Sequence, residues 1–164
     1  MLRFETAIGA CGISWSAAGV TGVWLLDPPA QALGDAPPPA FVTAATEGIA
    51  ALFRGESRDL REVPLDLAGV DEFAAGVYAA TRLVGPGEIC TYGDLARAVG
   101  SPGGAQAVGR ALGSNPCPIV VPCHRVLSST GALHGFSAPG GIATKRRMLE
   151  IERAPGFTQQ TLFA

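Results

Sequence analysis

Residues that could hold a metal ion are scarce in this sequence of 164 residues. It has only two histidines and four cysteines, and no two cysteines are separated by just two residues. Structural zinc sites draw their four ligands from closely spaced cysteines and histidines. The sequence therefore predicts no metal site.

Long hydrophobic runs are also missing, and the longest are far too short to span a bilayer. The N-terminus lacks the basic start and apolar stretch that are typical of a secretory signal peptide. We therefore expect a cytoplasmic protein with no membrane partner. In that compartment the four cysteines are expected to remain free thiols.

Hydrophobic residues nevertheless make up 48% of the chain, which is ample for a core. Charge is distributed unevenly along it. Residues 1–80 carry four basic and ten acidic side chains, whereas residues 81–164 carry eight basic and four acidic ones. A basic C-terminal half indicates either a polyanionic partner or ordinary scatter of surface charge.

Hydrophobic patterning and turn residues predict an α+β fold in two parts. The first part, residues 1–68, is expected to be a small α/β unit with a short antiparallel sheet. Its expected elements are strands at 2–8, 11–15 and 20–26, a loop at 27–39, a helix at 41–53 and an extended piece at 63–67.

The second part, residues 69–164, is expected to be mostly helical and winged-helix-like. Asp71 and Thr91 are good N-caps, because their side chains can accept from free helical N–H groups. Helices are expected from residue 71 to 83, 92 to 99, 103 to 112 and 142 to 153, with a loop at 128–141 and a loose tail at 155–164. The second and third helices, joined by a short turn with glycine, have the helix-turn-helix pattern.

The expected helix at 103–112 is unusually poor in large side chains. Glycine costs up to ~1 kcal/mol at each interior helical position, so its repeated use implies close approach of another body. That body is either the minor groove of DNA or a neighbouring helix. The residues concerned are Gly104, Ala105, Gln106, Ala107, Gly109 and Arg110.

Cys123 and His124 follow a short apolar run, residues 119–121, which is expected to be a buried strand that Pro122 ends. A thiol is a weak nucleophile until a base makes it a thiolate. Neighbouring residues of a strand point to opposite faces, so either the chain turns at Cys123 or a water bridges the pair. A buried cysteine beside a structural histidine is the other interpretation.

Several spaced motifs across residues 71–153 resemble one family, the O6-alkylguanine-DNA alkyltransferases, or methylated-DNA–protein-cysteine methyltransferases. The first 60 or so residues resemble it only in outline. The motifs are Gly87-Glu88, Thr91-Tyr92-Gly93-Asp94-Leu95-Ala96, Ala107-Val108-Gly109, Asn115-Pro116, Pro122-Cys123-His124-Arg125-Val126, Gly140-Gly141, Lys145 and Glu152.

The resemblance implies that a thiolate of Cys123 takes the alkyl group from O6 of guanine, once per molecule and without a cofactor. His124 would act through a water as the base, held by Glu152 as in other triads. Asn115 would brace this network. Tyr92 would donate to N3 of the departing base.

The resemblance also implies how the lesion is bound. The partner would be double-stranded DNA carrying O6-alkylguanine, with O4-alkylthymine as a second candidate lesion and the damaged base flipped out from the minor-groove side. The backbone carbonyls of Cys123 and Val126 and the backbone N–H of Ser137 would contact the base, beside Pro118 and Lys145. The protein is expected to act as a monomer. DNA contacts would come from Gly104, Ala105, Gln106, Ala107, Gly109, Arg110 and Arg125.

Two features depart from the family pattern. Gln106 stands where an arginine usually enters the base stack, and Arg110, one turn further on, is expected to supply the positive charge. The loop at 136–141 is about two residues longer than usual. Three other interpretations are a non-catalytic sensor of alkylated DNA, a cysteine hydrolase of acyl substrates and a winged-helix regulator.

Overall fold

The computed structural model describes residues 1–30 and 36–158. Parts of the expected loop at 27–39 and of the expected tail at 155–164 lie outside the described residues. The elements are β1 Leu2–Thr6, β2 Gly9–Trp15, β3 Val20–Leu25, α1 Ala40–Phe53, α2 Glu72–Thr81, β4 Cys90–Thr91, α3 Tyr92–Ala98, α4 Ala105–Gly113, the 3-10 turn η1 Cys123–Arg125, β5 Val126–Leu127 and α5 Ile142–Ile151.

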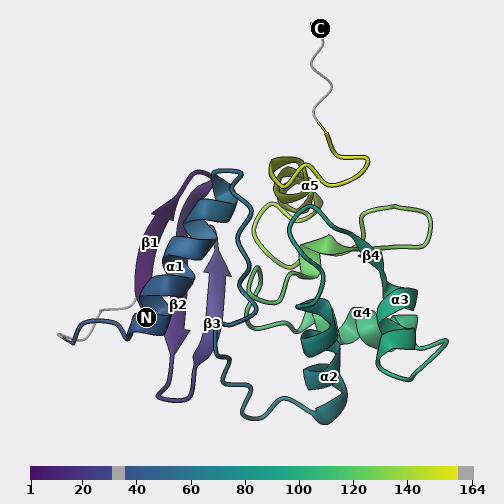
Figure 1. Ribbon diagram of the computed structural model, residues 1–164, viewed down its shortest axis with the longest axis horizontal. Coiled ribbons are helices and arrows are strands. Elements are labelled where there is room, and N and C mark those ends of the chain that lie inside the picture. The colour runs from purple at the N-terminus through teal and green to yellow at the C-terminus, as the bar shows by residue number, and fades with distance from the viewer. Residues whose placement is uncertain (31–35, 159–164) are drawn as a thin grey trace, which may run out of the picture.

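The N-terminal strands form an antiparallel meander in the order β1-β2-β3, as the sequence predicts. Helix α1 lies against this sheet, and the helices of the C-terminal half lie beyond its β3 edge in the view of Figure 1. The alternating residues Cys11 and Ile13 of β2 and Val23 and Leu25 of β3 are buried. The α+β fold class is therefore confirmed.

The expected N-caps are confirmed. The Asp71 carboxylate accepts from the backbone N–H of Ala74 at 2.9 Å. Thr91 and Asp94 form a reciprocal capping box at the start of α3. Both caps satisfy backbone donors that the first turn of a helix leaves free, and together they fix where α2 and α3 begin.

One expected element is wrong. Residues 119–121 form a turn rather than a buried strand, with an isolated bridge between Pro118 and Val121. Ile119 has a φ of +74°, which is outside the range that strands adopt. The extended piece expected at 63–67 makes a single bridge, between Leu65 and Val20.

The two halves pack through one continuous hydrophobic core that runs from Cys11 in β2 to Met148 in α5. Arg82, the C-cap of α2, reinforces this packing from the surface. Its Nη2 donates to three carbonyl oxygens of the connecting segment, those of Leu60, Arg61 and Val63, at 2.7 to 2.9 Å. The expected domain boundary near residue 68 stays a prediction.

Candidate active site

The chain turns sharply at Cys123, so one of the two expected arrangements of the Cys-His pair is confirmed. Residues 123–125 make one turn of 3-10 helix directly after Pro122. The side-chain amide of Asn115 donates to the carbonyl of Val121 at 3.0 Å and accepts from the N–H of Cys117 at 3.0 Å. Asn115 thus pins the two turns that present the half-buried Cys123.

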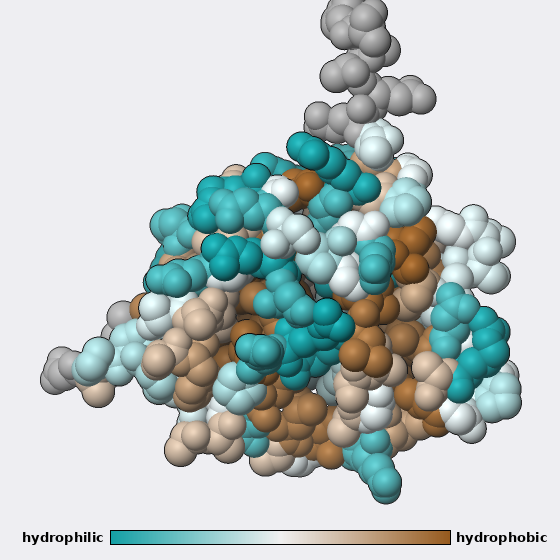
Figure 2. Space-filling view, in the orientation of Figure 1, coloured by the Kyte–Doolittle hydropathy of each residue, from teal (hydrophilic) through white to brown (hydrophobic). Residues whose placement is uncertain are grey.

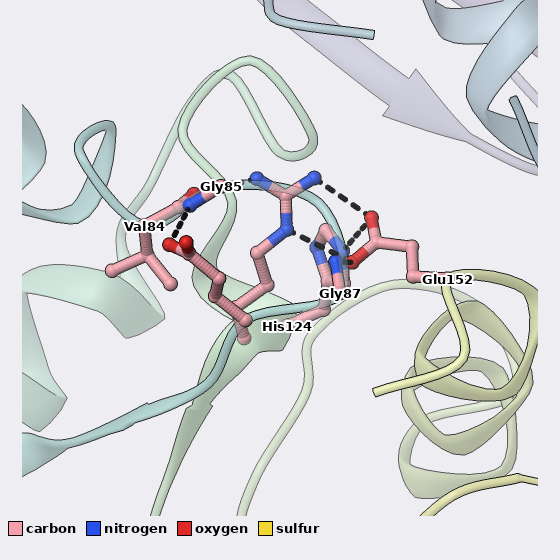
Figure 3. Close-up of polar contacts among 7 residues, drawn as sticks. Val84, Gly85, Gly87, His124 and Glu152 are labelled. Atoms are coloured by element: carbon pink, nitrogen blue, oxygen red, sulfur yellow. Dashed lines mark hydrogen bonds and ion pairs between the residues drawn. The ribbon is translucent and has the colours of Figure 1, made fainter. Parts of the chain in front are cut away.

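His124 is paired with Glu152, which lies at the C-terminal end of α5. His124 Nε2 lies 2.8 Å from Glu152 Oε1, and the imidazole is only 1% exposed. Figure 3 shows the two side chains facing each other, with the loop at Val84–Gly87 beside them. The backbone N–H of Gly87 also donates to Glu152, at 3.3 Å.

Arg125 is buried in the same network, 4% exposed, and does not lie on the surface where a DNA contact was expected. Its Nε and Nη2 donate to the two oxygens of Glu152 at 2.9 and 2.8 Å, and its Nη1 donates to Val84 O at 2.7 Å. A bidentate pair of this kind fixes the plane of the carboxylate. Arg125 therefore orients Glu152.

The charges of this network set the protonation of His124. Burial alone would raise the pKa of Glu152, but its contacts with His124 and Arg125 hold that pKa well below its usual range. Burial lowers the pKa of His124 despite the adjacent carboxylate. Glu152 is thus ionised and His124 neutral at physiological pH.

A neutral imidazole bonded to a carboxylate through Nε2 carries its proton there, as assigned from this network. Nδ1 is then the acceptor. This atom is buried and has no hydrogen-bond partner within the described part of the chain. Unpaired buried acceptors are rare. Nδ1 of His124, on the ring edge away from Glu152, is therefore available to act as a base.

The Cys123 thiol requires such a base. Burial raises its pKa, although a hydrogen bond with Asn115 and the positive charge of Lys145 act in the opposite direction. The resting sulfur is therefore a thiol. Proton removal must accompany its reaction with an electrophile.

Lys145 is a second buried cation, 1% exposed. Its Nζ donates to Val126 O at 2.7 Å and to His134 O at 3.4 Å, and lies 5.9 Å from the centre of the Tyr92 ring. A carbonyl oxygen has two lone pairs, so the Lys145 contact leaves Val126 able to accept a second donor.

Some of the expected site residues line two pockets. Cys123, Asn115, Pro118 and Ser137 line a pocket of about 360 Å³. Tyr92 lines a larger one of about 670 Å³ together with Ala105, Gln106 and Gly109. Strand β3 also lines the first pocket, and no sequence motif indicated this.

Two glycines of helix α4, Gly109 and Gly113, are not required by internal packing. A Cβ added at Gly109 would meet the Tyr92 ring at 4.0 Å, an ordinary contact, and one at Gly113 would meet nothing within 4 Å. Gln106 and Arg110 are exposed. Packing on a neighbouring helix therefore does not explain these two glycines, which favours the approach of an external partner.

Hydrophilic and hydrophobic side chains form alternating patches on the face of the molecule that Figure 2 shows.

Across residues 1–30 and 36–158, no three His, Cys, Asp or Glu side chains are grouped so that they could hold a metal ion. Within the same ranges no helix is both long and apolar enough to cross a membrane.

Comparison with known proteins gives this geometry a context. The sequence pattern of the 6-O-methylguanine DNA methyltransferase DNA-binding domain matches residues 72–154. A methylated-DNA–protein-cysteine methyltransferase of Mycobacterium tuberculosis is 42% identical over 127 residues, covering 77% of this chain and 74% of the relative. The enzyme of the same name from Methanothermobacter thermautotrophicus is 34% identical, covering 86% and 78%.

Solved structures of proteins with related names have the same fold. Mycobacterium tuberculosis OGT in complex with DNA superposes with a TM-score of 0.75 at 36% identity, and 93% of each chain is covered. An O6-methylguanine-DNA methyltransferase from Pyrococcus kodakaraensis gives a TM-score of 0.66 at 27% identity, over 92% of this chain and 96% of that one. The chain therefore belongs to the 6-O-methylguanine DNA methyltransferase family.

Proposed function

We propose that the protein repairs alkylated DNA by direct reversal, moving the alkyl group from O6 of guanine to Cys123. The observation that carries this proposal is the turn that presents Cys123 next to His124, whose Nε2 is held by Glu152 at 2.8 Å. The family and the names of its relatives supply the substrate class.

In the proposed reaction the Cys123 proton passes, through a water, to Nδ1 of His124. The sulfur attacks the alkyl carbon, an S–C bond forms, and the C–O6 bond breaks with its electron pair remaining on guanine. Tyr92 donates a hydrogen bond to N3 and offsets the charge that develops on the base. Glu152, oriented by Arg125, stabilises the imidazolium.

The thioether product has no route back to the thiol, because none of these groups can cleave an S–C bond. Each molecule therefore acts once. We propose that it acts as a monomer, and it needs no cofactor because the Cys123 sulfur is itself the acceptor. Such a reaction requires the base to leave the stack, so we place α4 in the minor groove. O4-alkylthymine carries its alkyl group on an equivalent exocyclic oxygen, and we propose it as a second substrate. We place the protein in the cytoplasm.

Intact-mass spectrometry tests this function. The protein is mixed with an excess of duplex containing one O6-methylguanine, and in parallel with the same duplex containing guanine. We expect the mass of one methyl group to be added with the damaged duplex only, and the addition to stop at one per protein. Tight binding with no change in mass would instead indicate a lesion sensor, and repeated turnover on esters would indicate a hydrolase.

Arg110 is expected to supply the cationic DNA contact that Gln106 does not provide. Arg110→Ala should weaken binding to damaged and undamaged duplex alike and reduce the slope of log affinity against log salt by about 1. Fluorescence anisotropy over a range of salt concentrations measures both. Arg3→Ala, which removes an exposed arginine from β1, is the matched control. An unchanged salt slope in Arg110→Ala would exclude this contact.

A further inference from the structure

The pocket beside Cys123 is built from both halves of the molecule. Cys123, Pro118 and the loop from Phe136 to Pro139, all in the C-terminal half, line it. Strand β3 and the residues that follow it, including Trp24 and Asp27, line it as well. Part of the wall around the reacting sulfur therefore comes from the half that carries none of the catalytic groups.

Strand β3 is hydrogen-bonded to the segment that leads to Cys123, which limits movement of the strand away from the site. The backbone N–H of Val23 donates to Pro116 O at 2.9 Å. The Cys117 thiol donates to Val20 O at 3.9 Å. Two hydrogen bonds thus join the edge of the N-terminal sheet to the segment that Asn115 pins.

The chain also leaves β3 in an unusual way. Leu26 and Asp27 have φ values of +55° and +50°, a left-handed conformation that residues other than glycine rarely adopt. Both residues line the pocket. The strand therefore ends in a tight change of direction at the pocket wall.

Trp24 is one of the β3 residues that line this pocket. Its side chain is 37% exposed, although large hydrophobic residues are usually more buried. A Cβ added at Gly22 would come within 2.8 Å of Trp24 Cη2, so the indole lies over a position that only glycine leaves open. Such a ring offers area and edge-to-face contacts to an apolar group.

We propose that Trp24 is a specificity-determining residue that selects large, uncharged alkyl groups on the lesion. The inference rests on the proposed function and concerns the same site. A methyl group fills little of a pocket of about 360 Å³, whereas a benzyl group fills much more of it and can contact the wall that Trp24 helps to form. The Asp27 carboxylate on the same wall disfavours anionic substituents.

Single-turnover rates on duplexes with O6-methylguanine and O6-benzylguanine test this role. Trp24→Ala should slow benzyl transfer about tenfold, the scale of one lost hydrophobic contact, and change methyl transfer less than twofold. Trp24→Phe, which keeps an aromatic ring, should restore most of the benzyl rate. Leu83→Ala, at an exposed residue away from this pocket, is the control.

Free O6-benzylguanine, which needs no DNA contact, should show the same loss with Trp24→Ala. Equal losses on the methyl and benzyl duplexes, or no loss on either, would overturn the role of Trp24. Phe and Ala variants that behave alike would also overturn it. Absence of methyl transfer by the wild-type protein would instead refute the proposed function.

Discussion

Cys123→Ser should abolish alkyl transfer while leaving binding to the damaged duplex within about twofold. The serine hydroxyl is far less acidic than a thiol, whose ordinary pKa is about 8.5. A buried neutral imidazole such as His124 is too weak a base to generate an alkoxide from it. Mass spectrometry after prolonged incubation should show no added methyl group, and anisotropy should show the retained affinity.

Cys90→Ser is the matched control for this variant. Cys90 is also a half-buried thiol, and burial raises its pKa to about 11. It is absent from the pocket that Cys123 lines, so its replacement should leave transfer at the wild-type rate. Methyl addition that persists in Cys123→Ser would mean that another residue is the acceptor.

Glu152→Gln should have the second largest effect and should act on both rate and stability. The amide cannot stabilise an imidazolium as a carboxylate does, and loss of the orienting carboxylate in a serine-protease triad costs about 10,000-fold in rate. It also leaves Arg125 buried without a counter-charge, which destabilises a fold by about 3–5 kcal/mol. Single-turnover kinetics at low temperature and urea denaturation measure the two losses separately.

Glu150→Gln, on the same helix, is the control for Glu152→Gln, because Glu150 lines a groove beside α1 and is not in contact with His124. It should retain wild-type kinetics and stability within about 0.5 kcal/mol. A folded Glu152→Gln variant that transfers at the wild-type rate would remove Glu152 from the mechanism.

The sequence predicts the local elements of the fold well. The caps at Asp71 and Thr91 are visible in it, because each depends on a hydrogen bond to a residue three positions away. The strand expected at residues 119–121 fails for the opposite reason. Its apolar run fits a buried strand, but Asn115 and the bridge between Pro118 and Val121 impose a turn. That turn depends on side-chain hydrogen bonds that hydrophobic patterning does not report.

The sequence indicates the reacting groups of the site better than it indicates the residues that surround and orient them. Cys123, His124 and Glu152 follow from motifs, and the structure brings the last two together although 28 positions separate them. The family resemblance implied that Arg125 contacts DNA. Its burial is decided by a carboxylate from another helix. Trp24 carries no motif, since its position depends on how the two halves pack.

The clamp that Arg82 makes on the connecting segment, together with the common core, limits how this molecule can move. If a flexible linker joined the two halves, they could open and close around a base by a hinge motion. Here one guanidinium holds three carbonyl oxygens of the connector, so the two halves cannot move apart freely. The DNA must therefore supply most of the movement that brings the damaged base to Cys123. The cavity, which changes little in shape, admits only bases and alkyl groups that fit it.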